Sequence, residues 1–389
     1  MKFSCKTSDL LQALNLVSRA ISNQQALPIL GNVLINIEGK RCTLSATDLE
    51  LSIITSFEAN IENEGSITVP AKALLNFAQY NNDAEVLLET SEGTQLKCTS
   101  QQSKTVITGE SAQEYPTITP IEKETSFTLK IGPLLDALHN VTFASAKTTL
   151  RPVLSGVYLR SEKGNLIFVS TDSYRLSEFA IPVESTGGDV SCIIPAKVLE
   201  ELRSVLSANK KNETQKIKDT KEENNDIENN LPTVDIALSA QQIEIRTGDT
   251  ILLSRLIEGK FPDYQQIIPK EKKTTVKLPT KDLTLIVKRM HYFAKEMNNN
   301  LTFHFSSKGV HITTPQTQIG QDEATMDVGV SGEDNKIALS SSYLLDFLSH
   351  TDDDEVELQL TDSMHPAVFH VQSRELFLHL IMPLRIQED

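Results

Sequence analysis

The chain has 389 residues, of which 39% are hydrophobic and 5% aromatic, and its formal net charge at pH 7 is −15. This length predicts two or three domains with cores rich in Leu, Ile and Val, and the acidic balance taken alone argues against a nucleic-acid-binding protein. The N-terminus has no signal-like segment and no apolar run approaches the ~18 residues of a membrane span, so we expect a cytoplasmic protein.

Six segments share a short apolar run that leads into an amphipathic helix. The two clearest copies, residues 66–80 and 191–206, both carry a Pro-Ala-Lys step where the helix begins. One leucine marks the same point in every copy, at Leu10, Leu74, Leu134, Leu199, Leu283 and Leu344. All but one of the intervals between these leucines span about 60 to 65 residues, which indicates an internal repeat. The longer interval contains a polar insertion at 209–230.

In chain order, helices are expected at 8–21, 71–80, 132–147, 195–211, 280–298 and 342–350, with short alternating strands between them. Proline-containing segments at 114–124 and 261–273 are typical of linkers. They divide the chain into three similar domains, 1–125, 126–270 and 271–389. Two helices and several strands per domain predict an α+β fold in which a helix pair covers antiparallel sheet. The insertion is almost entirely polar and charged, which predicts a disordered or mobile loop.

The sequence offers no catalytic, cofactor-binding or metal-binding constellation. Gly39-Lys40 and Gly259-Lys260 lack the first glycine of a phosphate-binding loop, and no dinucleotide-binding glycine motif is present. His304 and His311 lie on successive predicted strands, but two histidines without a third ligand do not predict a metal site.

A Thr-Asp pair recurs at Thr47-Asp48, Thr171-Asp172 and Thr361-Asp362. Paired carboxylates can perform acid–base chemistry, and that interpretation would make the chain a hydrolase. The alternative is a turn in which each aspartate accepts hydrogen bonds from its own backbone. The pairs sit at strand ends and no glycine follows them, which favours the turns.

The six expected helices carry eleven basic and seven acidic residues, a surplus of four positive charges, so the remainder of the chain carries −19. Lysine and arginine suit solvated helix faces, and that alone could explain the surplus. A repeated array of weakly basic helices would equally suit a polyanion held through its phosphates, with the acidic remainder confining it to that surface. The residues alone leave both interpretations open.

The whole chain outside 209–230 resembles the bacterial DNA polymerase III β subunit, the replicative sliding clamp. The resemblance rests on motifs in one order: MKF at the start, LPILGNVLI at 27–35, ATDLEL at 46–51, the VPAK and IPAK helix starts, STDSYRL at 170–176, GKFPDY at 259–264 and LIMPLRI at 380–386.

The resemblance implies three similar domains per chain, and a head-to-tail homodimer that closes a six-domain ring around duplex DNA of any sequence. It implies no reaction and no cofactor. The implied partners are the catalytic subunit of the replicative polymerase, a clamp loader and other proteins that carry a clamp-binding peptide. The residues by themselves would also suit a repeat-built peptide-binding scaffold unrelated to DNA.

The resemblance also implies site residues. A hydrophobic peptide cleft would be formed by Leu154, Thr171, Ser173, Tyr174, Arg175, Leu176, Pro262, Ile267, Tyr343, Met382, Pro383, Leu384 and Arg385. The DNA-facing residues would be Arg19, Lys72, Lys147, Lys197, Arg203, Lys288 and Arg289. Thr105 and Ile107 on an edge strand would meet Tyr292 and Phe293 across the dimer interface. Gln266 stands where the family often has a basic cleft residue, and residues 387–389 extend past the usual end, which leaves partner preference open.

Overall fold

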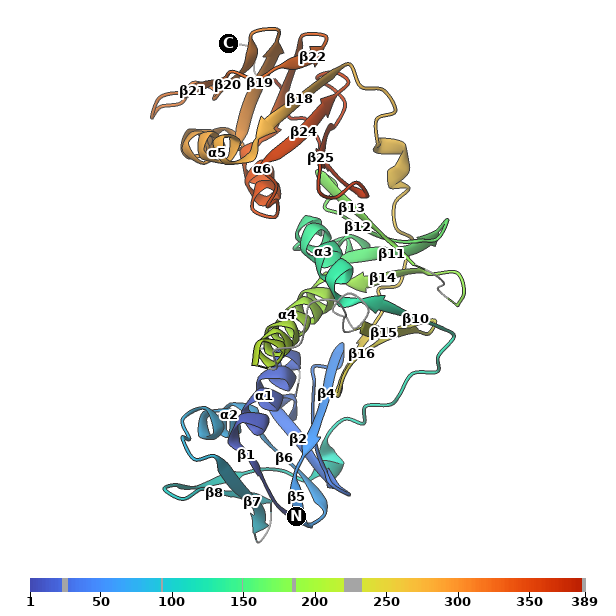
Figure 1. Cartoon of the computed structure of the whole chain (residues 1–389), viewed down its shortest axis with the longest axis vertical. Helices are drawn as coiled ribbons and strands as arrows, with labels where there is room; N and C mark the ends of the chain where they lie inside the picture. The colour runs from blue at the N-terminus through green and yellow to red at the C-terminus, as the bar shows by residue number, and fades with distance from the viewer. Residues whose placement is uncertain (23–26, 92–93, 149, 184–186, 220–232, 387–389) are drawn as a thin grey trace. The chain divides into compact units, whose positions relative to one another are not determined.

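The computed structural model describes residues 1–22, 27–91, 94–148, 150–183, 187–219 and 233–386, with the backbone alone for 208–219 (Figure 1). The chain divides into two compact units. Unit 1 comprises Met1–Ile131, Thr186–Gly188 and Glu200–Leu256, and unit 2 comprises Gly132–Ser185, Asp189–Leu199 and Ile257–Asp389.

Each of the six expected helices is confirmed. Their bounds are α1 Thr7–Val17, α2 Ala71–Gln79, α3 Ile131–Val141, α4 Ala196–Asp219, α5 Thr280–Ala294 and α6 Ser341–Leu348. The apolar stripe of α1 shows why these segments form helices that pack, because Leu10, Leu14 and Val17 are fully buried at helical spacing. The helix contacts both α2 and a strand of the sheet beside it.

Two helix ends differ from the prediction. Helix α3 ends at Val141 rather than at 147, because the Thr142 hydroxyl donates to the carbonyl of Leu138 and the Ser145 hydroxyl donates to that of Thr142. Lys147 therefore lies beyond the helix.

Helix α4 continues to Asp219, so the expectation of a disordered loop is wrong for 209–219. Lysine, glutamate and glutamine favour helix, and the segment follows a helix that is already formed. The rest of the predicted loop, 220–230, lies outside the described residues.

Unit 1 contains an eight-stranded sheet in the order β10-β15-β16-β17-β4-β3-β2-β6 and a five-stranded sheet in the order β5-β1-β7-β8-β9. The strand bounds are β1 Lys2–Lys6, β2 Asn32–Glu38, β3 Arg41–Thr47, β4 Leu51–Glu58, β5 Asn60–Asn63, β6 Gly65–Pro70, β7 Glu85–Ser91, β8 Gln95–Thr99, β9 Lys104–Thr108, β10 Thr125–Lys130, β15 Thr233–Leu238, β16 Gln242–Thr247 and β17 Thr250–Arg255.

Unit 2 contains a nine-stranded sheet in the order β14-β11-β12-β13-β26-β25-β24-β18-β22 and a four-stranded sheet in the order β21-β20-β19-β23. The strand bounds are β11 Gly156–Glu162, β12 Asn165–Thr171, β13 Arg175–Pro182, β14 Ser191–Pro195, β18 Thr274–Pro279, β19 Asn300–Ser306, β20 Gly309–Thr313, β21 Glu323–Met326, β22 Val330–Gly332, β23 Asn335–Ser340, β24 Glu355–Leu360, β25 Ala367–Val371 and β26 Phe377–Ile381. Helices α5 and α6 contact each other in this unit.

The two largest sheets run across the predicted domain boundaries. In unit 1, β4 of the first predicted domain pairs with β17 of the second. In unit 2, β13 of the second predicted domain pairs with β26 of the third. By contacts the chain therefore groups into two compact units. The domain boundaries 1–125, 126–270 and 271–389 stay a prediction.

Candidate functional site

The loop at 171–175 between β12 and β13 carries the first part of the predicted cleft. The Thr171 hydroxyl donates to the carbonyl of Arg175 (2.6 Å), and the Asp172 carboxylate accepts from the backbone N–H groups of Tyr174 (2.9 Å) and Arg175 (3.0 Å). Ser173 has φ 82°, a left-handed conformation that these hydrogen bonds hold in place. This geometry lifts Tyr174 into solvent, with 61% of the residue exposed.

The other Thr-Asp pairs build turns of the same kind. Asp48 accepts from the backbone N–H groups two and three residues later, and so does Asp362. The turn interpretation of the pattern is therefore confirmed. Each carboxylate is engaged by its own loop, which removes the basis for the hydrolase alternative.

Arg175 is buried beneath the cleft rather than lining its surface, with 4% of the residue exposed. Its guanidinium donates to Asp172 (3.1 Å), to Asp346 on α6 (2.7 Å) and to the carbonyl of Phe143 (2.9 Å). It also lies 4.8 Å from the centre of the Tyr343 ring. One buried cation thus ties the 171–175 loop to α6 and to the turn after α3.

The accessible part of the predicted cleft combines apolar and aromatic side chains with the polar Ser173 and the charged Arg385. The rings of Tyr174 and Tyr343 stack 6.4 Å apart, and the backbone N–H of Met382 donates to the carbonyl of Tyr174 (2.8 Å). Tyr343 and Met382 are half-buried, and Ile267 is exposed. Ser173, Pro262 and Arg385 are exposed as well, and Pro383 and Leu384 are half-buried.

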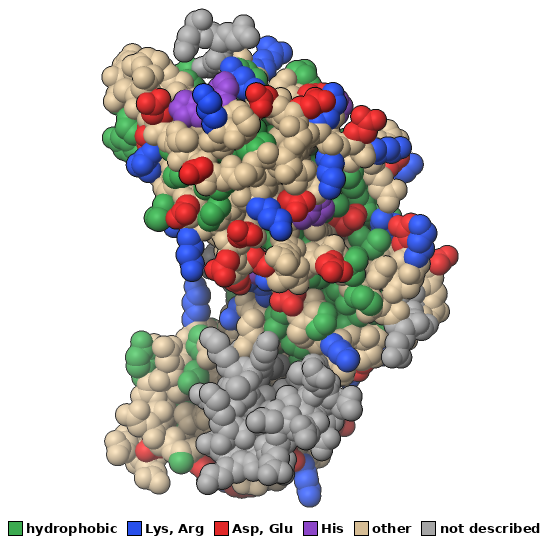
Figure 2. Space-filling view, turned by 45° about the horizontal axis from the view of Figure 1, so that its top comes forward, with side chains coloured by type: hydrophobic (Ala, Val, Ile, Leu, Met, Phe, Trp, Pro, Cys, Tyr) green, Lys and Arg blue, Asp and Glu red, His purple; other side chains and the backbone are tan. Residues whose placement is uncertain are grey.

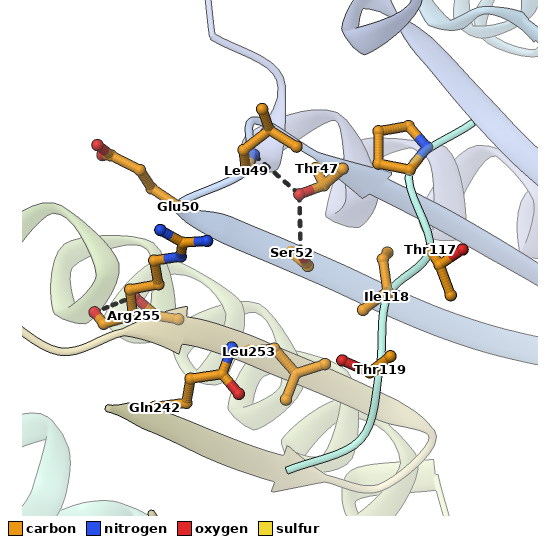
Figure 3. A pocket seen from close by; sticks show the side chains of 12 residues that line it. Thr47, Leu49, Glu50, Ser52, Thr117, Ile118, Thr119, Gln242, Leu253 and Arg255 are labelled. Atoms are coloured by element: carbon orange, nitrogen blue, oxygen red, sulfur yellow. Dashed lines mark hydrogen bonds between the residues drawn. The ribbon is translucent and has the colours of Figure 1, made fainter. Parts of the chain in front are cut away.

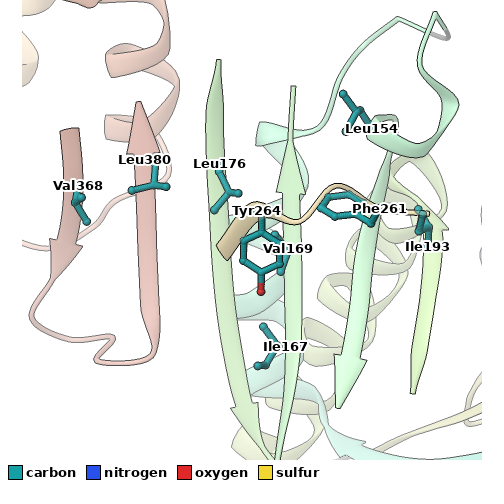
Figure 4. Close-up of a cluster of buried hydrophobic side chains, with 9 residues drawn as sticks. All are labelled: Leu154, Ile167, Val169, Leu176, Ile193, Phe261, Tyr264, Val368 and Leu380. Atoms are coloured by element: carbon teal, nitrogen blue, oxygen red, sulfur yellow. The ribbon is translucent and has the colours of Figure 1, made fainter. Parts of the chain in front are cut away.

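Beneath these residues lies a packed hydrophobic cluster (Figure 4). Leu176 on β13 and Leu380 on β26 stand on neighbouring strands, while Phe261 and Tyr264 of the linker segment lie across the face of the same sheet. Leu154 closes one end of the cluster and is buried, as is Thr171. The structure thus brings together Thr171, Ser173, Tyr174, Arg175, Tyr343 and Met382 in unit 2. Leu154, Thr171, Arg175 and Leu176 belong to the interior of this region.

The linker is held by a polar network that the sequence did not reveal. The Tyr264 hydroxyl donates to Glu178 and accepts from Arg160 Nε (3.1 Å) and Nη2 (3.0 Å). Burial, followed by the hydrogen bond to Glu178 and then by the negative charge of Glu178, raises the pKa of Tyr264. The only sequence signal that Tyr264 has a role was its position in the GKFPDY motif. Its partners lie 86 and 104 residues away along the chain, which no local pattern indicates.

His379 on β26 is a second buried polar group in this region, with none of its surface exposed. Its Nδ1 forms a hydrogen bond with the Ser177 hydroxyl (2.7 Å), and its ring stacks on Phe347 at 4.8 Å. Burial, together with the charges of Arg175 and His350, lowers the pKa of His379 well below the usual value.

We expect this histidine to make folding stability depend on pH. The folded chain keeps His379 neutral, whereas the unfolded chain protonates it near pH 6.5, so the unfolded state binds more protons below that pH. The free energy of unfolding should therefore fall below about pH 6.5, by about 1.4 kcal/mol per pH unit until the folded pKa is reached. Urea unfolding of the wild type and of His379→Phe between about pH 7 and pH 5 measures this contribution. Equal slopes for the two proteins would contradict the expectation.

Three family models match successive parts of the chain: the DNA polymerase III beta subunit N-terminal domain at residues 1–119, its central domain at 128–263 and its C-terminal domain at 265–385. The chain belongs to the DNA polymerase III beta subunit family. The beta sliding clamp of Synechocystis is 28% identical over 408 residues, which cover 99% of this chain and 100% of the relative. The beta sliding clamp of Chlamydia muridarum is 26% identical over 392 residues and is matched over 100% of both chains.

Solved structures show the same fold. The DNA polymerase sliding clamp from Bacillus subtilis has a TM-score of 0.89 at 24% identity, with 100% of both chains covered. The DNA polymerase III subunit beta from Pseudomonas aeruginosa has a TM-score of 0.88 at 25% identity, covering 99% of this chain and 100% of that one. The predicted α+β clamp fold is confirmed.

The chain is thus a DNA sliding clamp for DNA polymerase III, a processivity factor and not an enzyme. This membership argues against a scaffold unrelated to DNA. Across the described residues, none of the helices has the length and apolar character needed to cross a membrane. Within the same residues, no group of three or more His, Cys, Asp and Glu side chains could hold a metal ion.

The cations predicted to face DNA in this clamp differ in how they are engaged. Arg19 Nη1 lies 2.9 Å from Glu201, and Arg289 donates to Asp322 through Nε (2.8 Å) and Nη2 (3.1 Å). These pairs reduce what either arginine offers to a phosphate. The lysines of the set, Lys72, Lys147, Lys197 and Lys288, are exposed, and Arg203 is half-buried. Acidic and basic side chains are interspersed on the face that Figure 2 shows.

The predicted dimer residues of the clamp are placed as follows. Strand β9 is the last strand of its five-stranded sheet, as an edge strand should be. Ile107 points into unit 1 and is buried, so the exposed apolar side chain of this edge is that of Val106, while Thr105 is half-buried. At the end of α5, Tyr292 is exposed and its ring meets that of Phe293 edge-on at 5.5 Å. Alternation along the strand is the reason that Ile107 is inaccessible.

Proposed function

We propose that two copies of this chain close head to tail into a ring around duplex DNA in the cytoplasm, and that a clamp loader opens and closes the ring. The edge of β9 and the aromatic pair at the end of α5 would form the interface. An edge strand with unpaired N–H and C=O groups supports pairing of this kind. Thr105 and Ile107 would contribute their backbone groups, Val106 its side chain, and Tyr292 and Phe293 the opposing rings.

The DNA would be held by enclosure more than by affinity. The predicted set holds only seven cations per chain, four of them exposed lysines, and two of its arginines are engaged by carboxylates. Weak contacts to phosphates alone suit a protein that must slide, because they carry no sequence information. Such contacts weaken steeply as salt rises, whereas topological retention does not.

Partner proteins would bind through a peptide in the cleft formed by the thirteen residues named above. The single observation that supports this site best is the stacked pair of Tyr174 and Tyr343 beside Met382, all accessible above a buried apolar cluster. Exposed apolar surface over a rigid base is typical of peptide recognition. Methionine adds an adaptable contact for different partners.

Retention on DNA tests the ring. The chain would be loaded by its clamp loader onto nicked circular duplex DNA at about 0.2 M salt, a concentration that suppresses phosphate contacts. We expect the clamp to stay on the circle and to leave many times faster once the circle is cut. An uncut circle carried through the same steps is the control. Equal rates of release from both forms would rule out topological enclosure.

A further inference from the structure

Two loops of the chain share one backbone design, one in each unit. In the loop at 47–51, the Thr47 hydroxyl donates to the carbonyl of Leu51 (3.2 Å), and Asp48 accepts from the backbone N–H groups of Glu50 (3.1 Å) and Leu51 (2.8 Å). Leu49 has φ 76°. These are the contacts and the left-handed residue found in the 171–175 loop of the proposed peptide cleft.

The strand beside each loop is matched as well. The backbone N–H of Arg255 donates to the carbonyl of Glu50 (3.1 Å), just as that of Met382 donates to the carbonyl of Tyr174 (2.8 Å). In the sheets, Leu51 pairs with Ser254, and the corresponding cleft pair is Arg175 with Ile381. Glu50 and Arg255 therefore occupy the positions that Tyr174 and Met382 occupy in the cleft.

A cavity of about 260 Å³ lies at this loop, entirely within unit 1 (Figure 3). We call it the Thr47 groove, after the loop that borders it. Leu49, Ile118 and Leu253 supply its apolar walls, with Ile118 and Leu253 facing each other from the linker and from β17. Leu49 is 45% exposed, and its positive φ is unusual for a leucine. Exposure of this apolar side chain to solvent does not stabilise the fold.

The polar groups of the Thr47 groove distinguish it from the cleft. The side chains of Glu50 and Arg255 are both exposed, and within the described residues neither forms an ion pair. An arginine of this kind can bind a carboxylate through two parallel hydrogen bonds. Glu50 beside it repels a second acidic group and so restricts where a ligand's negative charge can lie.

We propose that the Thr47 groove is a second peptide-binding site of the chain. Its ligand is an extended segment of a partner protein in which an aliphatic residue lies next to a single Asp or Glu. The aliphatic side chain enters between Leu49, Ile118 and Leu253, and the carboxylate binds Arg255. The peptide class of the ligand rests on the proposed function of the cleft, while its charge preference comes from the groove itself.

A selection experiment tests the proposal with the full chain. A phage-displayed random heptapeptide library is selected on Met382→Asp, a variant in which the cleft is disabled. The expected pool is enriched in Leu, Ile or Val next to Asp or Glu. Synthetic peptides from this pool should bind Arg255→Glu in the same background at least about tenfold more weakly, since the charge contact is reversed. The control is Lys308→Glu, which makes the same reversal of charge at an exposed residue of unit 2 and should leave binding unchanged.

Two further arms make the test specific. Selection on Arg255→Glu in the Met382→Asp background should replace the acidic preference with Lys or Arg. Leu49→Asn keeps a residue that tolerates positive φ but removes the apolar wall, so it should weaken the same peptides without unfolding the loop. No enriched pool on Met382→Asp, or a pool that binds Arg255→Glu equally well, would overturn the second site. Failure of the cleft would appear separately, as binding of the replicative polymerase's catalytic subunit that neither Met382→Asp nor Arg255→Glu weakens.

Discussion

Replacing Met382 with aspartate is expected to weaken binding of the replicative polymerase's catalytic subunit by at least about 30-fold, the effect of losing about 2 kcal/mol at a binding hot spot. Met382 stands beside the stacked rings of Tyr174 and Tyr343, and its backbone is fixed by a hydrogen bond to the 171–175 loop. A carboxylate at this position would have to be desolvated when an apolar peptide side chain binds.

The matched control is Met382→Leu, which keeps an aliphatic side chain of similar volume and should bind within a few-fold of the wild type. Binding can be measured by surface plasmon resonance with the clamp immobilised. Because Met382 is half-buried, urea unfolding of both variants separates a binding defect from a folding defect. Unchanged polymerase affinity in a folded Met382→Asp variant would move the partner site elsewhere.

Replacing Arg175 with methionine is expected to lower the free energy of unfolding by about 3 kcal/mol, near the lower limit for breaking a buried ion pair from one side. The substitution removes the hydrogen bonds to Asp172, Asp346 and the Phe143 carbonyl and leaves the two carboxylates without their shared cation. Asp346 is the more exposed of the two, and water can compensate part of its loss. Because of this exposure, we expect a loss of stability near the lower limit for breaking a buried ion pair.

The same substitution should weaken polymerase binding, because Arg175 holds the 171–175 loop against α6 and supports the Tyr343 ring. Adding Asp346→Leu should recover part of the lost stability by removing one uncompensated charge. Lys308→Met is the control for loss of an exposed cation and should be nearly neutral. An unfolding free energy of Arg175→Met within about 0.5 kcal/mol of the wild type would show that the buried ion pair contributes little.

The sequence by itself determined the six helices, the turns at the Thr-Asp pairs and the family. Helices follow from apolar spacing within one segment, and an aspartate turn needs only residues within three positions of each other. The insertion departs from this pattern in its first half. Its charged composition indicated disorder, yet the same lysines and glutamates also favour helix, and α4 continues through them to Asp219.

Tertiary structure alone decided which residues each site can use. Arg175 is buried and pairs with Asp346, which lies 171 residues away along the chain. Arg19 pairs with Glu201, which lies 182 residues away. Strand pairing joined β4 to β17 and β13 to β26, so that each of the two largest sheets is shared between two of the predicted domains. Antiparallel pairing brings distant segments together through backbone groups that every residue carries. A local pattern of side chains therefore predicts that a strand forms, but not which strand lies beside it or what its loops enclose.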